Sequence, residues 1–552
     1  MYVDKSPVYC KGKPYRRVLL RESVRRGNKV QKITRCNLSD RSDEEIAAIE
    51  LALRYPQEIT TTSRLLPEIH LQQGVSIGAV AALQQVAKRL GIVRVLGSSR
   101  QGKLALWQII ARVIDQGSRL SAVRLASCSA ACGVLGLAAF HEDHLYQNLR
   151  WLYRRQARIE DALFAARHPG RPQTFFFYDI TSSYLEGEKH ELGAFGLNRD
   201  KKKRKQQIVA GLLCDERGEP VSIQVYRGNT SDQTTFLDQM RKVEERFGGR
   251  EVTFIGDRGM IKGPQIKALQ AAGMHYITGL SRPQISKLLS QGTIQMTLFD
   301  EGVAEVVDGE SGIRYLLRRN PLQAQKLAHA RERTLGRMRA TLTKENQRLA
   351  DHPLAKLETS LRRAEAARSR LKLREWVGIR AEGRVLQAVV DDSARERIAK
   401  LDGCYVLRTD LLDPRVAKET IHDRYKGLSD VERAFRTMKT NHLEMRPVHL
   451  RKAETTRGYA VVTMLAYLIV RELGHCWQAI DLTVEEGVRE LHTLCTQELR
   501  FGGKTLAHTI PDPNQQQQLL LTTANVKLPK IMTRPTEFVS TRKPLPQRRK
   551  KR

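Results

Sequence analysis

Residues 174–179, Thr-Phe-Phe-Phe-Tyr-Asp, form an aromatic, apolar run that ends on a carboxylate. The texture of the chain changes here, because a largely helical pattern precedes the run and strand-like runs follow it. An ionised carboxylate beside buried apolar side chains is costly unless a cation or hydrogen bonds compensate it. We therefore interpret residues 174–178 as a strand that delivers Asp179 at its end, where the carboxylate is either a metal ligand or a turn former.

The segments that follow this run alternate between strands and helices. We expect strands at Ile208–Cys214 and Pro220–Gly228, a helix at Asp232–Phe247, a strand at Val252–Ile255, a helix near Pro264–Ala272 and a strand at Tyr276–Leu280. Three strands, helix, strand, helix and strand is the order of an RNase H-like α/β core. The sequence thus predicts a mixed five-stranded sheet with helices. Asp257 follows its fourth strand, as Asp179 follows the first.

The charge of the chain points to a polyanionic partner. Its 552 residues include 94 Lys and Arg against 60 Asp and Glu, a net charge of +34. Nucleic acid fits this balance best, because phosphate contacts and counterion release supply the affinity. A basic membrane-surface protein is disfavoured, since we find no strongly amphipathic terminal helix beside the basic clusters. The longest apolar run, Tyr459–Val470, indicates a buried helix, and we expect no membrane partner.

The flanks of the core complete the expected organisation. Strands at Tyr15–Leu20 and Lys29–Cys36 flank a turn at Arg26-Gly-Asn28, and Ser42 can cap a helix at Asp43–Tyr55. The regions are 1–60, a β-hairpin and helix; 61–170, helical and DNA-end-binding; 171–284, the first part of the core; 285–415, an insertion with β-structure and long charged helices; 416–485, the second part of the core; and 486–552, with a basic tail. Within the insertion, the pattern of residues 322–374 predicts a hairpin of two helices, and the pattern of residues 385–411 predicts strands. Residues 61–170 are as compatible with a packed bundle. The eight scattered cysteines indicate reduced thiols in a cytoplasmic protein.

The two aspartates suggest metal-dependent phosphoryl transfer. Two Mg²⁺ or Mn²⁺ ions can activate a nucleophile and stabilise the leaving oxygen, and carboxylates hold such hard ions. Either aspartate alone is weak evidence, because a strand-terminal Asp more often forms a turn or caps a helix. Asp179 and Asp257 together, with the intervening strands and helix, are more specific.

Four sequence blocks resemble the DDE transposases of bacterial insertion sequences, specifically the IS-four superfamily. The blocks are Tyr178–Tyr184; Gln206–Leu213 with Gly218–Val221 and Gly228–Asp232; Gly256–Met260; and Leu401–Asp410 with Tyr425–Lys439 and Met445–Val448. The resemblance covers residues 175–470, with the insertion between the third and fourth blocks. It implies a dimer across both element ends and, often, a hairpin intermediate on the excised DNA.

The fourth block supplies the third acid. The family pattern is Tyr, two residues, Arg, three residues, catalytic Glu, six residues, Lys, and it matches Tyr425, Glu432 and Lys439, whereas Leu428 replaces the Arg. On a helix, Glu432, Arg436 and Lys439 share one face, and Arg436 can supply part of the missing phosphate contact. The structural alternative is a surface ion pair between Glu432 and Arg436. The competing acids are Glu186, Glu419, Asp430 and Glu444.

Several basic and aromatic residues are candidates for DNA contacts. Lys201, Lys202, Lys203, Arg204 and Lys205 lie between the first two core strands, where they form either a solvated loop or a phosphate-binding turn. The basic tail at 548–552 adds non-specific affinity. For Trp107 and Trp151, packing in a core is favoured over stacking on a base.

These observations predict a transposase that binds terminal inverted repeats and target DNA, and that nicks and joins strands with two metal ions on Asp179, Asp257 and Glu432. Two alternatives remain open. One is a non-catalytic DNA-binding protein, such as a domesticated transposase that acts as a repressor. The other is an RNase H-like nuclease that cuts without joining.

Overall fold

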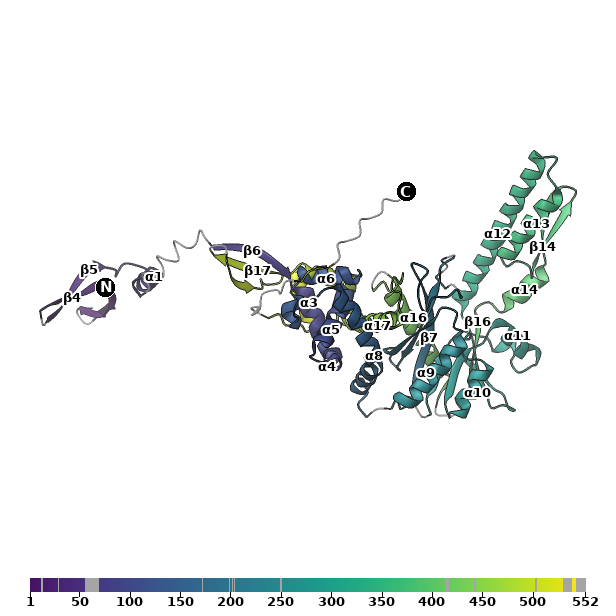
Figure 1. Cartoon of the computed structure of the whole chain (residues 1–552), viewed down its shortest axis with the longest axis horizontal. Coiled ribbons are helices and arrows are strands. Elements are labelled where there is room, and N and C mark those ends of the chain that lie inside the picture. Colours follow the sequence, from purple (N-terminus) through teal and green to yellow (C-terminus); the bar gives the residue numbers. More distant parts are fainter. Residues whose placement is uncertain are drawn as a thin grey trace.

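The protein combines a large mixed sheet with many helices, and Figure 1 shows its arrangement. The computed structural model describes residues 1–10, 13–27, 29–54, 69–170, 172–197, 199–200, 202, 204–248, 251–412, 416–440, 443–501, 504–529 and 539–542. In Figure 1 the helical region lies on one side of the sheet, and a pair of long helices projects from the other side.

An eight-stranded mixed sheet forms the centre, in the order β12-β13-β16-β11-β10-β7-β8-β9. Its first five strands in the chain and their helices are β7 (Phe175–Tyr184), β8 (Gln207–Cys214), β9 (Pro220–Arg227), α9 (Asp232–Arg246), β10 (Thr253–Gly256), α10 (Gly263–Ala271) and β11 (His275–Gly279). Strand β7 runs antiparallel to β8 and parallel to β10. The predicted order of these elements is confirmed, because each has a strong apolar periodicity of its own.

The prediction of five strands is wrong. Three strands from the expected insertion extend the same sheet: β12 (Ala304–Val307), β13 (Arg314–Arg319) and β16 (Cys404–Thr409). Strand β16 pairs antiparallel with both β11 and β13, and it buries Val406 and Leu407. These partners lie far apart in the chain, and local periodicity carries no information about which strands pair.

The remaining part of the insertion is mostly helical. It contains α11 (Arg282–Ser290), η2 (Met296–Leu298), α12 (Pro321–Asp351), α13 (Leu357–Arg370), the hairpin β14 (Val377–Glu382) and β15 (Val385–Val390), and α14 (Asp392–Lys400). Helices α12 and α13 confirm the expected two-helix hairpin, and they share a separate core that includes Met338 and Trp376. Helix α14 interrupts the region expected to hold strands, and Asp391 caps it by accepting from the Ala394 N–H.

The N-terminal unit contains β1 (Tyr2–Lys5), β2 (Val8–Cys10), β3 (Lys13–Tyr15), β4 (Val18–Arg26), β5 (Lys29–Asn37) and α1 (Asp43–Arg54). The hairpin of β4 and β5 is confirmed, although its first strand lies several residues later than expected, because β4 pairs with both β1 and β5 along its length. Ser42 caps α1, and its Oγ accepts from the Glu45 N–H at 3.2 Å.

A group of helices lies beside the sheet (Figure 1). They are α3 (Gly78–Arg89), α4 (Ile92–Leu96), α5 (Arg100–Ile114), α6 (Arg119–Ser127), α7 (Ala131–Leu135) and α8 (Glu142–Arg167), with α17 (Ala453–Cys476), α18 (Val484–His492) and α19 (Gln515–Thr523) from the C-terminal part. Strands β6 (Ile69–Ser76), β17 (Cys495–Phe501) and β18 (Lys504–Thr509) form a small separate sheet.

Helix α17 packs between α8, α5 and β9, and most of its apolar side chains are buried. The apolar run at 459–470 was expected to form a buried helix, and the helix that contains it is also long and apolar enough to span a bilayer by length and composition. This is weak evidence for a membrane, because a buried core helix passes the same test.

Candidate active site

Two aspartates follow the paired segments of two neighbouring strands. Strands β7 and β10 are parallel, with Phe177 opposite Ile255, so that Asp179 and Asp257 each lie two residues beyond that pair. Strand β10 ends at Gly256, and Asp257 begins a turn in which its carbonyl accepts from the Met260 N–H at 2.9 Å. Asp257 is exposed, whereas Asp179 is half-buried.

Asp179 was expected at the end of its strand, and this detail is wrong. Strand β7 continues to Tyr184, because β8 pairs with it from Phe177↔Cys214 to Tyr184↔Gln207. On the other side of β7, the pairing with β10 ends at Phe177, before Asp179 is reached. Asp179 therefore lies in mid-strand, beside the opening that the end of β10 leaves.

The third acid is carried by a helix that packs on β7. Helix α15 (Lys418–Lys426), which was not predicted, precedes α16 (Leu428–Lys439), which has the predicted bounds, and Glu432 is exposed on α16. The expected apolar stripe of Val431, Phe435 and Met438 is buried. At Gly427, between the two helices, an added Cβ would lie 2.4 Å from Cζ of the Phe177 ring. The absence of a side chain here lets the start of α16 approach β7 closely.

Gly427→Ala is expected to reduce both stability and DNA cleavage. The φ of Gly427 is −58°, which suits any residue, so the clash with buried Phe177 decides the effect. Overpacking of this kind costs about 1–3 kcal/mol, and relief of the clash moves α16 away from β7. Denaturant unfolding and a cleavage assay measure the two effects. Gly474→Ala in α17 is the matched control, because its Cβ would lie an ordinary 3.7 Å from Val484. Equal behaviour of the two variants would contradict this account.

The three acids share one electrostatic environment. The pKa of Asp179 is raised to about 6, mainly by burial and to a smaller extent by Asp257 and Glu432, whereas the Ile180 N–H and Arg199 lower it. Burial also raises the pKa of Tyr425 to about 12, with smaller upward contributions from all three acids. The pKa of Asp179 and the pKa of Tyr425 are therefore both raised by Asp257 and Glu432.

The donor set suits a hard divalent cation, although the acids do not yet converge. In the part of the chain that the structure describes, no three His, Cys, Asp or Glu side chains are close enough together to hold a metal ion. Asp179 is nevertheless a buried carboxylate with two further carboxylates nearby, an arrangement that a cation would stabilise. All three side chains offer oxygen, which Mg²⁺ prefers. The residues therefore fit a metal in charge and donor type, and metal binding would require Glu432 and Asp257 to close on Asp179.

The alternative of a surface ion pair on α16 is not formed. Among the described residues of this helix, Asp430 pairs with Arg433 at 3.3 Å, while Glu432 and Arg436 do not pair. Other competing acids have local partners: Glu186 pairs with Lys205 at 2.8 Å, and Glu419 lies 4.0 Å from Lys418. Glu432 is therefore the acid on α16 that raises the pKa of Asp179.

The residues expected around the acids occupy different environments. Tyr425 is half-buried over β11, with its hydroxyl 2.8 Å from a Cβ built at Gly279. Arg436 is exposed, whereas Leu428, at the family's Arg position, is buried in the core. Leu428 thus packs where the family pattern has a cation. DNA contacts by Tyr425 and Arg436 remain predictions.

Lys439 is buried and connects α16 to the sheet. Its Nζ donates to Thr181 Oγ1 at 2.8 Å and to Asp200 Oδ1 at 2.9 Å. Asp200 also pairs with Arg446, and its carboxylate is almost fully buried. Sequence reasoning missed Asp200, because it directly precedes the Lys run and reads as part of a solvated loop. As it stands, Lys439 positions α16 against β7.

Part of the basic run can be placed. Lys201 and Lys203 lie outside the described residues, as does the tail at 548–552. Lys202 Nζ lies 5.6 Å from the centre of the Tyr184 ring, and Lys205 pairs with Glu186. Arg204 adopts a positive φ of 57°. Lys202 and Lys205 therefore lie beside the far end of the strand that carries Asp179.

Trp107 and Trp151 pack in the helical region. Trp107 is fully buried, and its Nε1 donates to the Ala122 carbonyl at 3.1 Å. Trp151 packs against the same core, and Arg155 lies 5.3 Å from its ring. Core packing is thus confirmed for both.

Comparison with known proteins finds one family and a set of solved structures. The family model described as a transposase DDE domain matches residues 170–469, more than half of the chain. No curated protein matches. A cryo-EM structure of a piggyBac transposase synaptic complex with hairpin DNA is similar at 10% sequence identity, with a TM-score of 0.36, over 70% of this chain and 69% of that chain.

Proposed function

The chain belongs to the family of transposase DDE domains, and from this premise we propose that it binds the terminal inverted repeats of an insertion sequence and catalyses Mg²⁺-dependent strand cleavage and strand transfer. One observation carries the proposal. Asp179 and Asp257 each lie two residues beyond the pair Phe177 and Ile255 of two parallel strands, and both Asp257 and Glu432 raise the pKa of Asp179. A carboxylate whose pKa is raised by burial and by two neighbouring acids is typical of a functional site.

We also propose that the core is RNase H-like and that the chain is a member of the IS-four superfamily. The strand order β11-β10-β7-β8-β9 supports the first proposal, because β8 runs opposite to the other four strands. The spacing of Tyr425, Glu432 and Lys439 supports the second. A homodimer that holds both DNA ends is part of the same proposal.

Asp179, Asp257 and Glu432 would hold two Mg²⁺ ions. When bound, such ions activate water or a 3′-hydroxyl and stabilise the leaving oxygen in an in-line displacement. Asp179 must be ionised to bind a cation, and its raised pKa couples metal binding to loss of a proton. Lys439 holds α16 against β7, which keeps Glu432 on the side of the aspartates. Arg436, exposed one turn beyond Glu432, can contact the phosphate backbone of the bound strand.

The non-catalytic alternative is less well supported. A protein that only binds DNA has no use for a buried carboxylate next to two further acids, because this arrangement costs stability when no cation is present. The nuclease alternative shares the site and differs only in the second step, the attack of a released 3′-hydroxyl on target DNA. Strand transfer therefore separates these two readings.

The test is an assay with end-labelled duplexes taken from the DNA that flanks the gene. With Mg²⁺ or Mn²⁺ we expect a nick at the element end and then a joined product with plasmid DNA, and EDTA should abolish both. Nicking without joining would support the nuclease. Binding of the duplex without any cleavage, at every metal tested, would favour the DNA-binding alternative and refute the proposal.

A further inference from the structure

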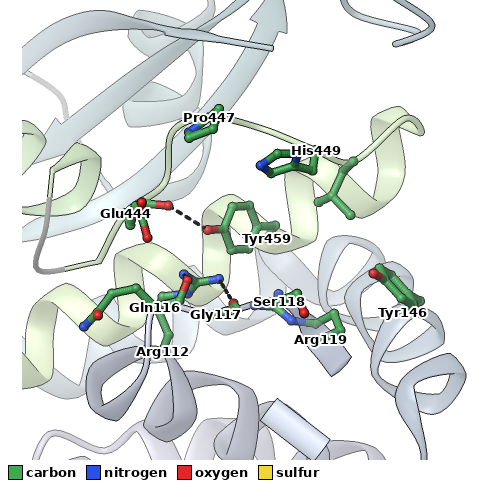
Figure 2. A pocket seen from close by; sticks show the side chains of 11 residues that line it. Arg112, Gln116, Gly117, Ser118, Arg119, Tyr146, Glu444, Pro447, His449 and Tyr459 are labelled. Atoms are coloured by element: carbon green, nitrogen blue, oxygen red, sulfur yellow. Dashed lines mark hydrogen bonds between the residues drawn. The ribbon is translucent and has the colours of Figure 1, made fainter. Parts of the chain in front are cut away.

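A cavity of about 250 Å³ lies between the helical region and the segment that connects α16 to α17 (Figure 2). Arg112 of α5, Arg119 of α6 and Tyr146 of α8 line one side, and Tyr459 of α17 lies at its centre. Glu444, Pro447, His449 and Leu450 line the opposite side. The cavity is separate from the three acids and no step of the proposed reaction uses it.

Two buried arginines share one aromatic ring in this cavity. The guanidinium carbons of Arg112 and Arg119 lie 5.0 and 5.1 Å from the centre of the Tyr459 ring. Arg112 donates to the Gly117 carbonyl at 3.0 Å, but Nε of Arg112 and Nε of Arg119 have no hydrogen-bond partner. Only 4% and 6% of these two residues is exposed.

No acid within the described residues neutralises this pair. Glu444 lines the same cavity, but it forms no ion pair with either arginine, and its backbone carbonyl accepts from the Tyr459 hydroxyl at 3.3 Å. The pKa of Arg119 is lowered to about 10, mainly by burial and also by the charge of Arg112. The Arg119 side chain still carries its charge at neutral pH. Two adjacent buried cations without an anion are costly, and the face of one ring compensates them only in part.

The cavity has the chemistry of a phosphate site. A guanidinium presents several N–H donors in a planar fork that matches phosphate oxygens. Arg119 is also the first residue of α6, a nine-residue helix whose N-terminus favours an anion. The volume exceeds that of a bare phosphate and leaves room for an attached sugar. Tyr146, His449 and Leu450 supply the polar and apolar contacts that a nucleotide would need.

The rim of the cavity is continuous with the active-site strand. The Val448 N–H donates to the Tyr184 carbonyl at 3.0 Å, next to a β-bridge between Leu185 and Val448. Arg446, on the same segment, pairs with the buried Asp200 that also binds Lys439. A nucleic-acid strand held at the cavity would therefore run along the connection from α16 and the end of β7.

We propose that this cavity binds a backbone phosphate of the DNA on which the protein acts, with Arg119 and Arg112 as its cationic donors. The inference rests on the proposed function only in taking DNA as the source of the phosphate. Arg112 donates to backbone carbonyls and shapes the site, whereas Nε of Arg119 has no hydrogen-bond partner among the described residues. Arg119 is therefore the residue to test.

The experiment measures binding of the full chain to duplexes from the DNA that flanks the gene, without metal so that no cleavage occurs. Single backbone phosphates are replaced one at a time by neutral methylphosphonate. In the wild type, one such replacement should weaken binding, and Arg119→Met should weaken it similarly, with no further loss when the two are combined. The slope of log affinity against log salt should fall by about 1 in Arg119→Met. Arg119→Lys should recover part of the affinity.

The matched control is Arg333→Met, which removes an exposed cation from α12. In this variant the same methylphosphonate must still weaken binding. Thermal unfolding without DNA gives a second readout: Arg119→Met should be as stable as the wild type or more stable, because a buried unneutralised charge is lost. A less stable Arg119→Met with unchanged phosphate dependence would show a structural role and overturn the inference.

Two further outcomes would also overturn it. If inorganic phosphate raises the Tm of the wild type but not of Arg119→Met, and no methylphosphonate position couples to Arg119, the cavity takes a free anion and not DNA. If the wild type binds no duplex at all, the proposed function fails as well. Duplex binding without any coupling to Arg119 overturns the phosphate site alone.

Discussion

Asp179→Asn is expected to abolish strand cleavage and, at neutral pH without metal, to make the protein more stable. The loss of a carboxylate that holds the metal removes several kcal/mol of transition-state stabilisation, so we expect cleavage to fall more than about a thousandfold. The free protein gains, because Asp179 is buried beside Asp257 and Glu432 and its ionised form is disfavoured. A residue that supports only the fold would show losses in both properties.

The pH dependence of stability gives the sign of this effect. The pKa of Asp179 is raised from 3.8 to about 6, so the folded protein holds the proton more tightly than the unfolded chain. Ionisation therefore costs stability progressively as the pH rises from about 4 to about 6, and the full cost, about 3 kcal/mol, is present above that window. Asp179→Asn lacks this dependence, so its advantage should be absent near pH 4 and complete at pH 7.5.

Denaturant unfolding at both pH values in EDTA measures this difference, and Mg²⁺ provides the control. Ligand that binds only the folded state stabilises it, so Mg²⁺ should raise the stability of the wild type and leave Asp179→Asn unchanged. If Asp179→Asn is less stable than the wild type at pH 7.5 in EDTA, or if it still cleaves, the assignment of Asp179 as a metal ligand is wrong.

Local patterns in the sequence were sufficient for the elements that carry the acids. The helix at 428–439 has the predicted bounds, because its apolar residues recur at helical spacing and bury one stripe. The order from β7 to β11 also follows from local apolar runs. Because two such strands pair in parallel, Asp179 and Asp257 each lie two residues beyond the same residue pair, Phe177 and Ile255. The acids were thus accessible from residue type and spacing.

Contacts between distant segments were not accessible in this way. Lys439 binds Asp200, 239 residues earlier, and Arg119 lies against Tyr459 from another region of the chain. Periodicity describes which face of an element is buried and not what covers it. The same limit explains why the three additional strands of the sheet were missed, and why Asp179 was placed at a strand end when β8 in fact extends the strand past it.

Glu432→Gln is expected to reduce cleavage more than about a hundredfold, because loss of even an outer-shell partner of a metal costs about 10–100-fold. Asp430→Asn is the matched control on the same helix. Asp430 pairs with Arg433. It also lies against the turn after β8, where a Cβ added at Gly218 would be 2.8 Å from the Cβ of Asp430. Glu432 instead acts on Asp179 and Tyr425.

Both substitutions remove one negative charge from α16, so a general effect of charge on DNA affinity would appear equally in the two variants. Affinity for the flanking duplex and the cleavage rate should therefore be measured side by side at one salt concentration. We expect similar affinities and a large difference in rate, with Asp430→Asn within a few-fold of the wild type. Comparable losses of rate in both variants would show that α16 carries no specific ligand, and the third acid would then have to come from another element.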